Sequence, residues 1–361
     1  MDIDVILEPD VSPTQMAELA VEAEKLGIRA IWSSNYHQDY DCFLALAPAA
    51  AATSKIILGA LAVSPWELHP LKMANAVLTL NEMCDGRAMI AISGGGGVLG
   101  ATGWRIRKDG PTWPIKDERK GNRYPERRVR GVQECIEILE HARSGKLAHL
   151  YDGEIFQITR PFVINYAKAS DPLVYGCCSG LMMIRMGARI ADGIQLSDFT
   201  IDMLPDAMSN VAKGLEKRER PADGFRVGNF WAFHIKQDIE KSMYEARREL
   251  IWRGAIAARY ETDIAPHVGG DDEVNVVIEN WDSFFKAFWT RTGQIDNVPE
   301  TVVNDLIAGM SSAGDLNAMY REIERYRGFK ASGLTELSLR LFDDPTDGLK
   351  LIGEHVLPAL R

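Results

Sequence analysis

The chain has 361 residues, enough for two ordinary domains or one large fold. Hydrophobic residues make up 46% and charged residues 25%, a globular composition that excludes extensive disorder. The net charge of −10 disfavours nucleic acid as a partner, because phosphates repel a negative domain. No run of about 18 apolar residues predicts a membrane span, and the first residues lack a basic signal region. Five cysteines without framework spacing favour a reducing, cytoplasmic location.

Short apolar runs alternate with amphipathic stretches, the pattern of strand–helix units around a parallel sheet. In chain order, strands are predicted at residues 4–8, 29–33, 55–62, 88–93, 173–177, 193–197, 226–236 and 334–341. Helices are predicted at residues 12–26, 41–52, 69–84, 126–144, 179–191, 201–220, 239–260, 299–308, 315–330 and 345–360. Ser12 and Pro13 start the first helix and Gly27 ends it. Residues 148–158 predict a small hairpin.

Eight strands that alternate with helices predict an α/β fold, a (β/α)8 TIM barrel in which residues 1–361 form a single domain. Such barrels need about 250 residues, and insertions at about residues 104–125 and 262–297 account for most of the excess. A doubly wound sheet is the main alternative, but no GxGxxG motif follows the first strand. In a barrel, chemistry lies where strands end. Those ends are residues 8–9, 34–37, 62–65, 94–97, 177–180, 197–198 and 237–238.

Several segments resemble the bacterial luciferase-like family of flavin- and deazaflavin-dependent oxidoreductases. AEKLGIRAIWSS is similar to the family's second helix-to-strand passage, and LVYGCCSGLMMIRMGARIADGIQL to its fifth and sixth strands. The block from LALAPAAAATSKIILG to AMIAISGGGG has Thr53, His69–Pro70 and Gly86–Arg87 in the family's register. GEHVLPAL is similar to the C-terminal end. The resemblance covers nearly the whole chain outside the two insertions and implies a luciferase-like barrel.

Within the family, SPWELHP and the glycine-rich run followed by Leu-Gly resemble the methylenetetrahydromethanopterin reductase branch and related deazaflavin-dependent alcohol dehydrogenases. This branch implies coenzyme F420, a deazaflavin that carries hydride, whereas other branches use FMN. The chain departs from the branch at the end of the second strand, where Asn35–Tyr36 replace an Asp-His pair and His37 follows one position later. The acid of the glycine-rich loop is missing, and the acid of the first strand is expected at Glu8, two positions late.

The resemblance implies cofactor contacts at the ends of strands two to five. The expected contacts are Asn35, Leu61, Ala62, Ser64, Gly94, Gly95, Gly96, Gly176, Cys177 and Cys178. Glycines let a ring or phosphate approach the backbone, although a flexible loop is the simpler interpretation. The turn after strand five leads into a helix whose N–H groups favour a phosphate, and plain strand–helix packing is the alternative. The cysteines then contribute backbone, and no metal is expected, because no further Cys or His has ligand spacing.

The end of strand three carries, in the family, a bulge with a non-prolyl cis peptide behind the cofactor ring. The register implies that this peptide is Leu61–Ala62, and an ordinary trans strand end is the alternative. Ser64 could hydrogen-bond the cofactor or only begin the turn at Pro65.

Three side chains are catalytic candidates. His37 could act as acid or base near neutral pH, or lie in a polar surface loop. Tyr36, with Asn35, could orient a substrate carbonyl or a cofactor amide. Glu8 could relay a proton or anchor a substrate, and a buried salt bridge is the alternative.

Other residues have a structural interpretation beside the functional one. His69 is expected to cap a helix before Pro70. Trp66, Trp104 and Trp231 could line the pocket or belong to the core.

Residues 105–130 contain ten basic and four acidic residues, so a net charge of +6 follows the glycine-rich loop and the rest of the chain carries −16. This segment is either a solvated insertion or an anion funnel that suits a polyglutamyl cofactor tail or an acidic substrate. Arg105, Arg107 and Lys108 lie nearest the loop.

The sequence therefore predicts a cytoplasmic oxidoreductase that transfers hydride between a deazaflavin and a small organic substrate. The alternatives are an FMN-dependent luciferase-like monooxygenase and a non-catalytic relative that keeps the barrel. The resemblance also implies a homodimer or higher homo-oligomer formed through the early helices.

Overall fold

The structure is a computed structural model that describes residues 1–104, 125–144, 150–162, 164, 171–258 and 261–361. The chain separates into two compact units. Unit 1 contains residues 1–5, 196–205 and 229–361, and unit 2 contains residues 6–195 and 206–228. Every residue expected to contact the cofactor or to act in catalysis belongs to unit 2. Within the described ranges, no helix has the length and apolar character needed to cross a bilayer.

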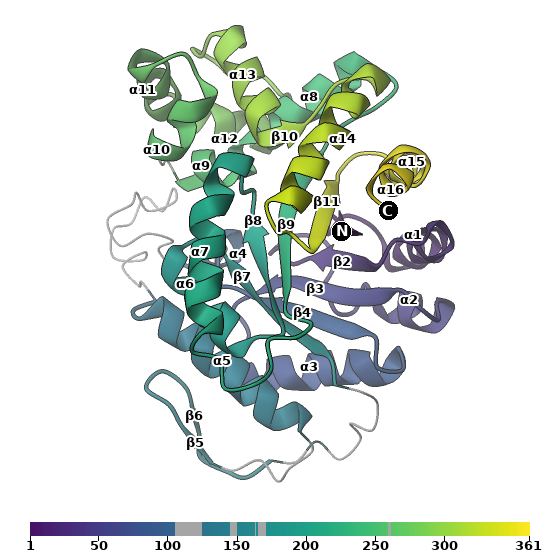
Figure 1. Cartoon of the computed structure of the whole chain (residues 1–361), viewed down its shortest axis with the longest axis vertical. Coiled ribbons are helices and arrows are strands. Elements are labelled where there is room, and N and C mark those ends of the chain that lie inside the picture. The colour runs from purple at the N-terminus through teal and green to yellow at the C-terminus, as the bar shows by residue number, and fades with distance from the viewer. Residues whose placement is uncertain (105–124, 145–149, 163, 165–170, 259–260) are drawn as a thin grey trace. The chain divides into compact units, whose positions relative to one another are not determined.

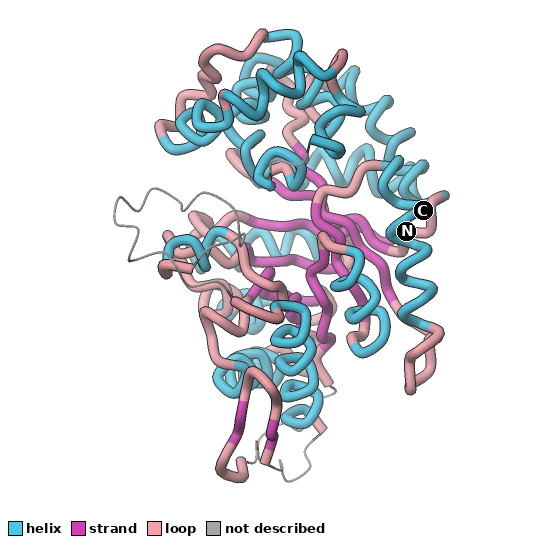
Figure 2. The backbone as a smooth tube through the Cα atoms, turned by 90° about the vertical axis from the view of Figure 1, so that its left-hand side faces the viewer, coloured by secondary structure: helices cyan, strands magenta, loops and turns pink. Residues whose placement is uncertain are grey.

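The sheet is a closed parallel barrel with surrounding helices, so the predicted (β/α)8 fold is confirmed (Figure 1). Its order is β10-β9-β11-β1-β2-β3-β4-β7-β8, and an additional pairing of β8 with β9 closes it. The strands are β1 (Asp2–Leu7), β2 (Ala30–Ser34), β3 (Ile57–Val63), β4 (Ala88–Ile92), β7 (Leu173–Cys178), β8 (Gly193–Ser197), β9 (Arg226–Phe233), β10 (Ser311–Ser312) and β11 (Glu336–Leu341). The predicted hairpin is confirmed as antiparallel β5 (Tyr151–Asp152) and β6 (Gln157–Ile158), visible as two short strands in Figure 2. β10 was not predicted, because two serines carry no strand signal.

The helices follow the predicted order, with differences at their ends. They are α1 (Pro13–Leu26), α2 (Ala47–Ala52), α3 (Pro70–Met83), α4 (Gly97–Ala101), α5 (Arg128–Arg143), α6 (Leu181–Ile190), α7 (Leu204–Leu215), α8 (Ile239–Glu249), α9 (Gly254–Ala258), α10 (Glu261–Ile264), α11 (Asp271–Glu279), α12 (Trp281–Trp289), α13 (Glu300–Met310), α14 (Leu316–Ala331), α15 (Pro345–Leu351) and α16 (Leu357–Leu360). Short turns of 3₁₀ helix are η2 (Ile201–Met203), η3 (Leu250–Trp252) and η4 (Ala265–His267), and η5 (Ile352–Val356) is a π-helical turn.

Four predicted boundaries are wrong. The helix expected at residues 41–52 begins only at α2, because the Asp41 carboxylate accepts the N–H groups of Phe43 and Leu44 and holds a turn there. The helix expected at 201–220 ends with α7, since Arg218 turns back to donate to the carbonyls of Ala188 and Ala191. The helix expected at 239–260 breaks after α8, and the strand expected at 226–236 ends with β9. The stretch 262–297, interpreted as an interruption, contains α10, α11 and α12.

The amino end of β3 is fixed by two charged side chains of unit 2. The Glu24 carboxylate of α1 accepts the backbone N–H groups of Ser54, Lys55 and Ile56 at 2.6–2.9 Å. Although burial raises the pKa of Glu24, these hydrogen bonds outweigh it and lower that pKa to about 2. The Arg87 guanidinium donates to the Thr53 hydroxyl and to the carbonyls of Ala50, Thr53 and Ile56. The Thr53 and Gly86–Arg87 positions of the family pattern therefore hold the start of β3 in place.

The interior of unit 2 is packed around an aromatic side chain beside a glycine. Trp32 of β2 is fully buried and pairs in register with Gly59 of β3. Its ring occupies the space where a Cβ on Gly59 would lie, 2.3 Å from the nearest ring carbon. Tyr175 of β7 meets the same ring edge to face, with centroids 5.9 Å apart. A glycine is therefore required at position 59 by close packing.

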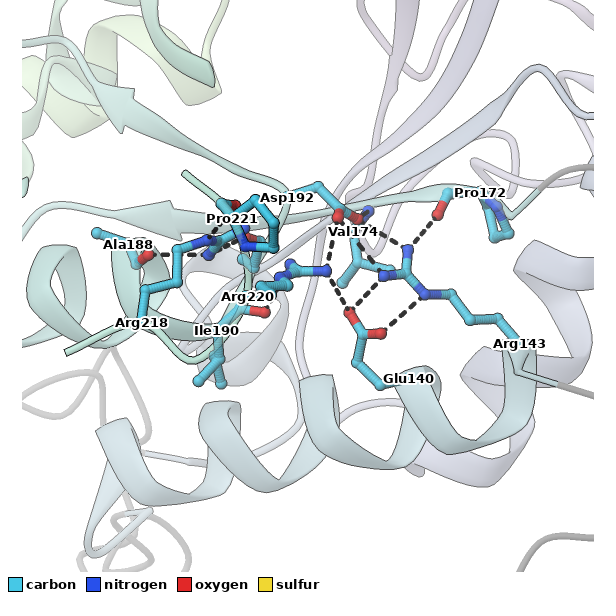
Figure 3. Close-up of polar contacts among 11 residues, drawn as sticks. Glu140, Arg143, Pro172, Val174, Ala188, Ile190, Asp192, Arg218, Arg220 and Pro221 are labelled. Atoms are coloured by element: carbon cyan, nitrogen blue, oxygen red, sulfur yellow. Dashed lines mark hydrogen bonds and ion pairs between the residues drawn. The ribbon is translucent and has the colours of Figure 1, made fainter. Parts of the chain in front are cut away.

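A network of ion pairs lies at the amino end of β8 (Figure 3). Asp192 contacts Arg143 of α5 at 2.8 Å and Arg220 at 3.0 Å, and it accepts the N–H of Val174 at 2.8 Å. Glu140 accepts from Arg143 at 2.6 Å. Burial by itself raises the pKa of Asp192, but the hydrogen bonds and charge of Arg143, with Val174 and Arg220, hold it below its ordinary value. One carboxylate thus links α5, β7 and the chain after α7.

We expect Asp192→Asn to destabilise the protein by about 2–3 kcal/mol at neutral pH, because the mostly buried Arg143 loses its main counter-charge. Chemical denaturation measures the loss. Since the pKa of Asp192 is lowered in the folded state, its contribution is present above about pH 4 and is lost as the pH falls. The difference between wild type and variant should therefore shrink in acid. The exposed Asp171→Asn is the matched control, and an equal loss in both variants would contradict the assignment.

Candidate functional site

Asn35 joins the carboxyl ends of β2 and β3. Its backbone N–H donates to the carbonyl of Leu61 at 2.5 Å, and its Nδ2 donates to the carbonyl of Ala62 at 3.2 Å. The Asn35 Oδ1 accepts from the Cys42 thiol, with an S–O distance of 3.6 Å. This residue follows the last residue of β2, which pairs with Leu61 in parallel register. Three of the expected cofactor contacts, Asn35, Leu61 and Ala62, are therefore in direct contact.

The peptide bond between Leu61 and Ala62 is cis, where the family resemblance implied it. The pairing of β3 with β4 shifts in register between Ala60 and Val63, so the expected bulge is present too. Both carbonyls of the Leu61 and Ala62 pair are occupied by donors from Asn35. The expected cis peptide is therefore confirmed, and Asn35 holds it at the carboxyl end of β3.

Glu67 is a residue of this site that the sequence analysis missed. One oxygen, Oε1, accepts from Asn35 Nδ2 at 2.5 Å and from the Ser64 N–H at 2.8 Å. Burial raises the pKa of Glu67 to about 7, against the lowering effect of the hydrogen bonds from Ser64 and Asn35. The signal for it was present: Ser64 and Glu67 are spaced as in a capping box, where the glutamate reaches back to the serine N–H. The Ser64 Oγ differs from that pattern, because it accepts the N–H of Trp66 at 3.4 Å, while the N–H of Glu67 donates to the Ser64 carbonyl.

The glycine-rich loop lies beside Ser64. A Cβ placed on Gly95 would be 3.1 Å from Ser64 Oγ, and Gly95 has a φ of 90°, which favours glycine. A Cβ on Gly94 would meet the Arg128 side chain at 2.5 Å and Met183 of α6 at 3.5 Å. Around Gly96, by contrast, no heavy atom of the described residues lies within 4 Å of the Cβ position. The loop thus contacts Ser64 on one side and α6 on the other, and leaves backbone open at Gly96.

The turn after β7 adjoins this loop, since Ile92 at the end of β4 pairs with Gly176 of β7. Gly176 packs against Gly187 of α6, and the Cys178 thiol also faces Gly187. Cys178 is buried and Cys177 is half-buried. The helix α6 begins after Gly180, with no side chain capping its first N–H groups and open space around the Gly180 Cβ position. Strand–helix packing explains Gly176 and Cys178, and among the described residues no side chain caps the N–H groups at the start of α6.

Two of the three catalytic candidates lie in the segment after β2. Tyr36 and His37 have their rings 4.6 Å apart; Tyr36 is half-buried and His37 is exposed. Glu8 follows β1 and accepts from the hydroxyl of Ser34 at 3.3 Å. Glu8 is therefore tied to the end of β2, one residue before Asn35, whereas no described contact ties His37 to the cis peptide edge. Their catalytic roles stay predictions.

Other sequence expectations have definite outcomes. His69 is confirmed as a cap, because its Nδ1 accepts the Leu71 N–H at 3.2 Å at the start of α3. Trp231 belongs to the core of unit 1, where it is fully buried and donates to Ser312 Oγ at 2.9 Å. Trp66 is half-buried beside Phe156. Arg105, Arg107 and Lys108 lie outside the described residues.

Comparison with known proteins shows which family this chain belongs to. The profile of the luciferase-like monooxygenase family matches residues 2–328. The chain is 24% identical to the 5,10-methylenetetrahydromethanopterin reductase of Archaeoglobus fulgidus over 355 residues, which cover 98% of each protein. It is 26% identical to the F420-dependent glucose-6-phosphate dehydrogenase of Nakamurella multipartita over 249 residues, which cover 65% of this chain and 68% of that protein.

Solved structures share the fold. The coenzyme F420-dependent tetrahydromethanopterin reductase of Methanopyrus kandleri superposes with a TM-score of 0.80 at 22% identity, covering 100% of this chain and 99% of that chain. The oxygenating constituent of 3,6-diketocamphane monooxygenase from Pseudomonas putida, solved with FMN, gives a TM-score of 0.62 at 17% identity and 99% coverage of both. The family prediction is thus confirmed together with the barrel. From the profile match over residues 2–328, the chain belongs to the luciferase-like monooxygenase family and is an enzyme of that family.

Proposed function

We propose that this enzyme transfers hydride between coenzyme F420 and a small organic substrate. The observation that carries the proposal is the edge formed by the Leu61–Ala62 cis peptide, Asn35 and Ser64, with the glycine-rich loop beside it. Two similar proteins that are named for F420, the dehydrogenase of Nakamurella multipartita and the solved reductase of Methanopyrus kandleri, support this cofactor. The branch pattern SPWELHP supports it as well.

The residues present fit a phosphate-bearing deazaflavin. Backbone is open at Gly96 and at Gly180, where an added Cβ would meet no described atom within 4 Å. The uncapped N–H groups at the start of α6 and the positive end of its dipole favour an anion. At the strand ends the half-buried Asn35 can offer the second lone pair of its Oδ1 to an N–H edge of the ring, since its Nδ2 donates to Glu67 and Ala62. The bound deazaflavin would supply the hydride chemistry, as donor or acceptor of two electrons.

The chain's own residues would position the reactants and handle protons. Asn35 would orient the ring against the Leu61–Ala62 edge, the buried Ser64 supports that edge through its hydrogen bond to Glu67, and the packed strand ends would exclude water behind the ring. Glu8, held by Ser34, is the proposed anchor or proton relay. His37 and Tyr36 are proposed to meet the substrate, because they lie on the segment that follows Asn35.

We also propose a cytosolic homo-oligomer. None of the five cysteines forms a disulfide in the part of the chain that the structure describes, which includes all of them, and this fits the reducing compartment that the cysteine count suggested. The oligomer rests on the family resemblance alone, and size-exclusion chromatography with light scattering tests it.

Titration with oxidised and reduced F420 and FMN, followed by absorbance and fluorescence, tests the cofactor. We expect F420 to bind at least tenfold more tightly than FMN, a difference of about 1.4 kcal/mol. Tight FMN binding with oxygen consumption would favour the monooxygenase instead. Failure to bind either cofactor would favour a non-catalytic relative.

Gly180→Val tests the proposed phosphate position without disturbing the fold. Its backbone is extended and a side chain there meets open space, so we expect an unchanged unfolding temperature. F420 affinity should fall about tenfold or more, because the side chain covers the N–H groups of α6. Gly270→Val is the matched control: it is also an uncapped helix N-cap with extended backbone, at the start of α11. Equal loss of affinity in both variants, or no loss in either, would argue against the phosphate position.

A further inference from the structure

We propose that Glu67 is a positioning residue of the cofactor site. Its ionised carboxylate holds Asn35 against the Leu61–Ala62 peptide, and protonation of that carboxylate weakens the hold. F420 binding therefore depends on the protonation state of Glu67. The inference rests on the proposed function for its cofactor, but the positioning of Asn35 can be measured without any ligand.

Local sequence brings the carboxylate to this place. After Ser64 the chain makes a tight turn, in which the N–H groups of Glu67 and Leu68 both donate to the Ser64 carbonyl. The turn carries the Glu67 side chain back over the strand end, where Oε1 accepts the Ser64 N–H at 2.8 Å. The same oxygen accepts Asn35 Nδ2 at 2.5 Å. One oxygen atom therefore bridges the ends of β2 and β3.

How firmly the Asn35 amide is held depends on the charge of that oxygen. Cys42 donates its S–H to Asn35 Oδ1, and Nδ2 then points toward two acceptors, Glu67 Oε1 and the carbonyl of Ala62. An ionised carboxylate can only accept, so a flipped amide would set two acceptors against each other. A protonated carboxyl is a weaker acceptor than a carboxylate and can also donate, so protonation weakens the hold of Glu67 on Nδ2, while the carbonyl of Ala62 favours the same amide orientation in both states. Ionisation of Glu67 thus strengthens one arrangement of the residue that lines the expected ring position.

The proton equilibrium of Glu67 lies in the working range. Desolvation by burial raises its pKa to about 7, although the N–H groups of Ser64 and Asn35 favour the charged form. Both states are therefore populated near neutral pH, whereas an exposed glutamate is ionised throughout that range. The hydrogen bonds to Asn35 and Ser64 make the arrangement depend on the charge of Glu67, and burial sets the pH at which that charge changes.

Other titratable groups lie on the surrounding elements. They are His37, Asp41 and Cys42 after β2, Glu8 after β1, and His69 in the same loop as Glu67. Burial raises the pKa of the Cys42 thiol well above its usual range, so Cys42 stays neutral. Burial lowers the pKa of His69, so its imidazole is neutral near pH 7. Glu8, His37 and Asp41 are the competing explanations for a pH effect, and the Glu67→Gln variant separates them because it leaves all three side chains in place.

The first arm measures F420 binding from about pH 5.5 to about pH 8.5 in wild type, Glu67→Gln and Glu18→Gln. We expect wild-type affinity to rise at least threefold through a midpoint near pH 7, the ionisation range of Glu67. Glu67→Gln should lose this step, and the exposed control Glu18→Gln should keep it. Ionisation of the cofactor itself is common to all three proteins and cancels in their ratio. A step that persists in Glu67→Gln, or no step in wild type, would overturn the proposal.

The second arm needs no cofactor. With ¹⁵N-labelled asparagine, the side-chain resonance that Asn35→Ala removes should shift with a midpoint near pH 7 in wild type and not in Glu67→Gln. Because the folded-state pKa of Glu67 is raised, its contribution to stability is greatest below about pH 4.5 and is lost as the pH rises through 7. The unfolding temperature of Glu67→Gln relative to wild type should therefore rise by about 2–5 °C between pH 5 and pH 8.

The two arms separate the two hypotheses. If neither F420 nor FMN binds at any pH, the proposed function fails, and the Asn35 resonance alone decides the positioning role. If F420 binds with no pH step and the resonance does not titrate, the proposed function stands and the role of Glu67 is refuted.

Discussion

The candidate site depends on a single acceptor atom, Oε1 of Glu67, which receives N–H donors from the ends of two neighbouring strands. Parallel strands leave their carboxyl ends without further ladder partners, so something other than the sheet must hold those ends together. Here Asn35 donates hydrogen bonds to the carbonyls of both Leu61 and Ala62, and Glu67 accepts a hydrogen bond from the Asn35 side chain. Ser64 donates its N–H to the same glutamate oxygen, and Gly95 of the glycine-rich loop packs beside Ser64.

Charge has opposite uses within unit 2. At the amino end of β8, Asp192 is surrounded by Arg143 and Arg220, and at the amino end of β3, Glu24 receives three backbone N–H groups. Both carboxylates have lowered pKa values and are stable anions. Glu67 has two donors, the N–H groups of Ser64 and Asn35, and neither carries a positive charge, so burial prevails and its pKa rises. The difference between a structural anion and a titrating one is therefore the number and charge of the donors around it.

Much of the fold was accessible from the sequence, because strand–helix alternation and helix caps are local signals. Ser12, Gly27 and His69 act as expected at their helix ends, and the cis peptide lies where the family register implied it. The late start of α2 comes from a local turn held by Asp41, but two other failures are tertiary in origin. The helix at residues 201–220 ends early because Arg218 reaches carbonyls of α6 and its following loop, which no local pattern encodes. Glu67 was missed because its importance comes from a contact 32 residues away, with Asn35.

The fixed start of β3 has a consequence for the evolution of such enzymes. Glu24 and Arg87 anchor the strand at the end opposite the cis peptide, so its register does not depend on the residues around Ser64. A one-residue slip would exchange the two faces of the strand, and the anchor prevents it. The SPWELHP turn can then vary without shifting the register of β3, provided that Ser64 and Glu67, which hold Asn35 in place, are kept.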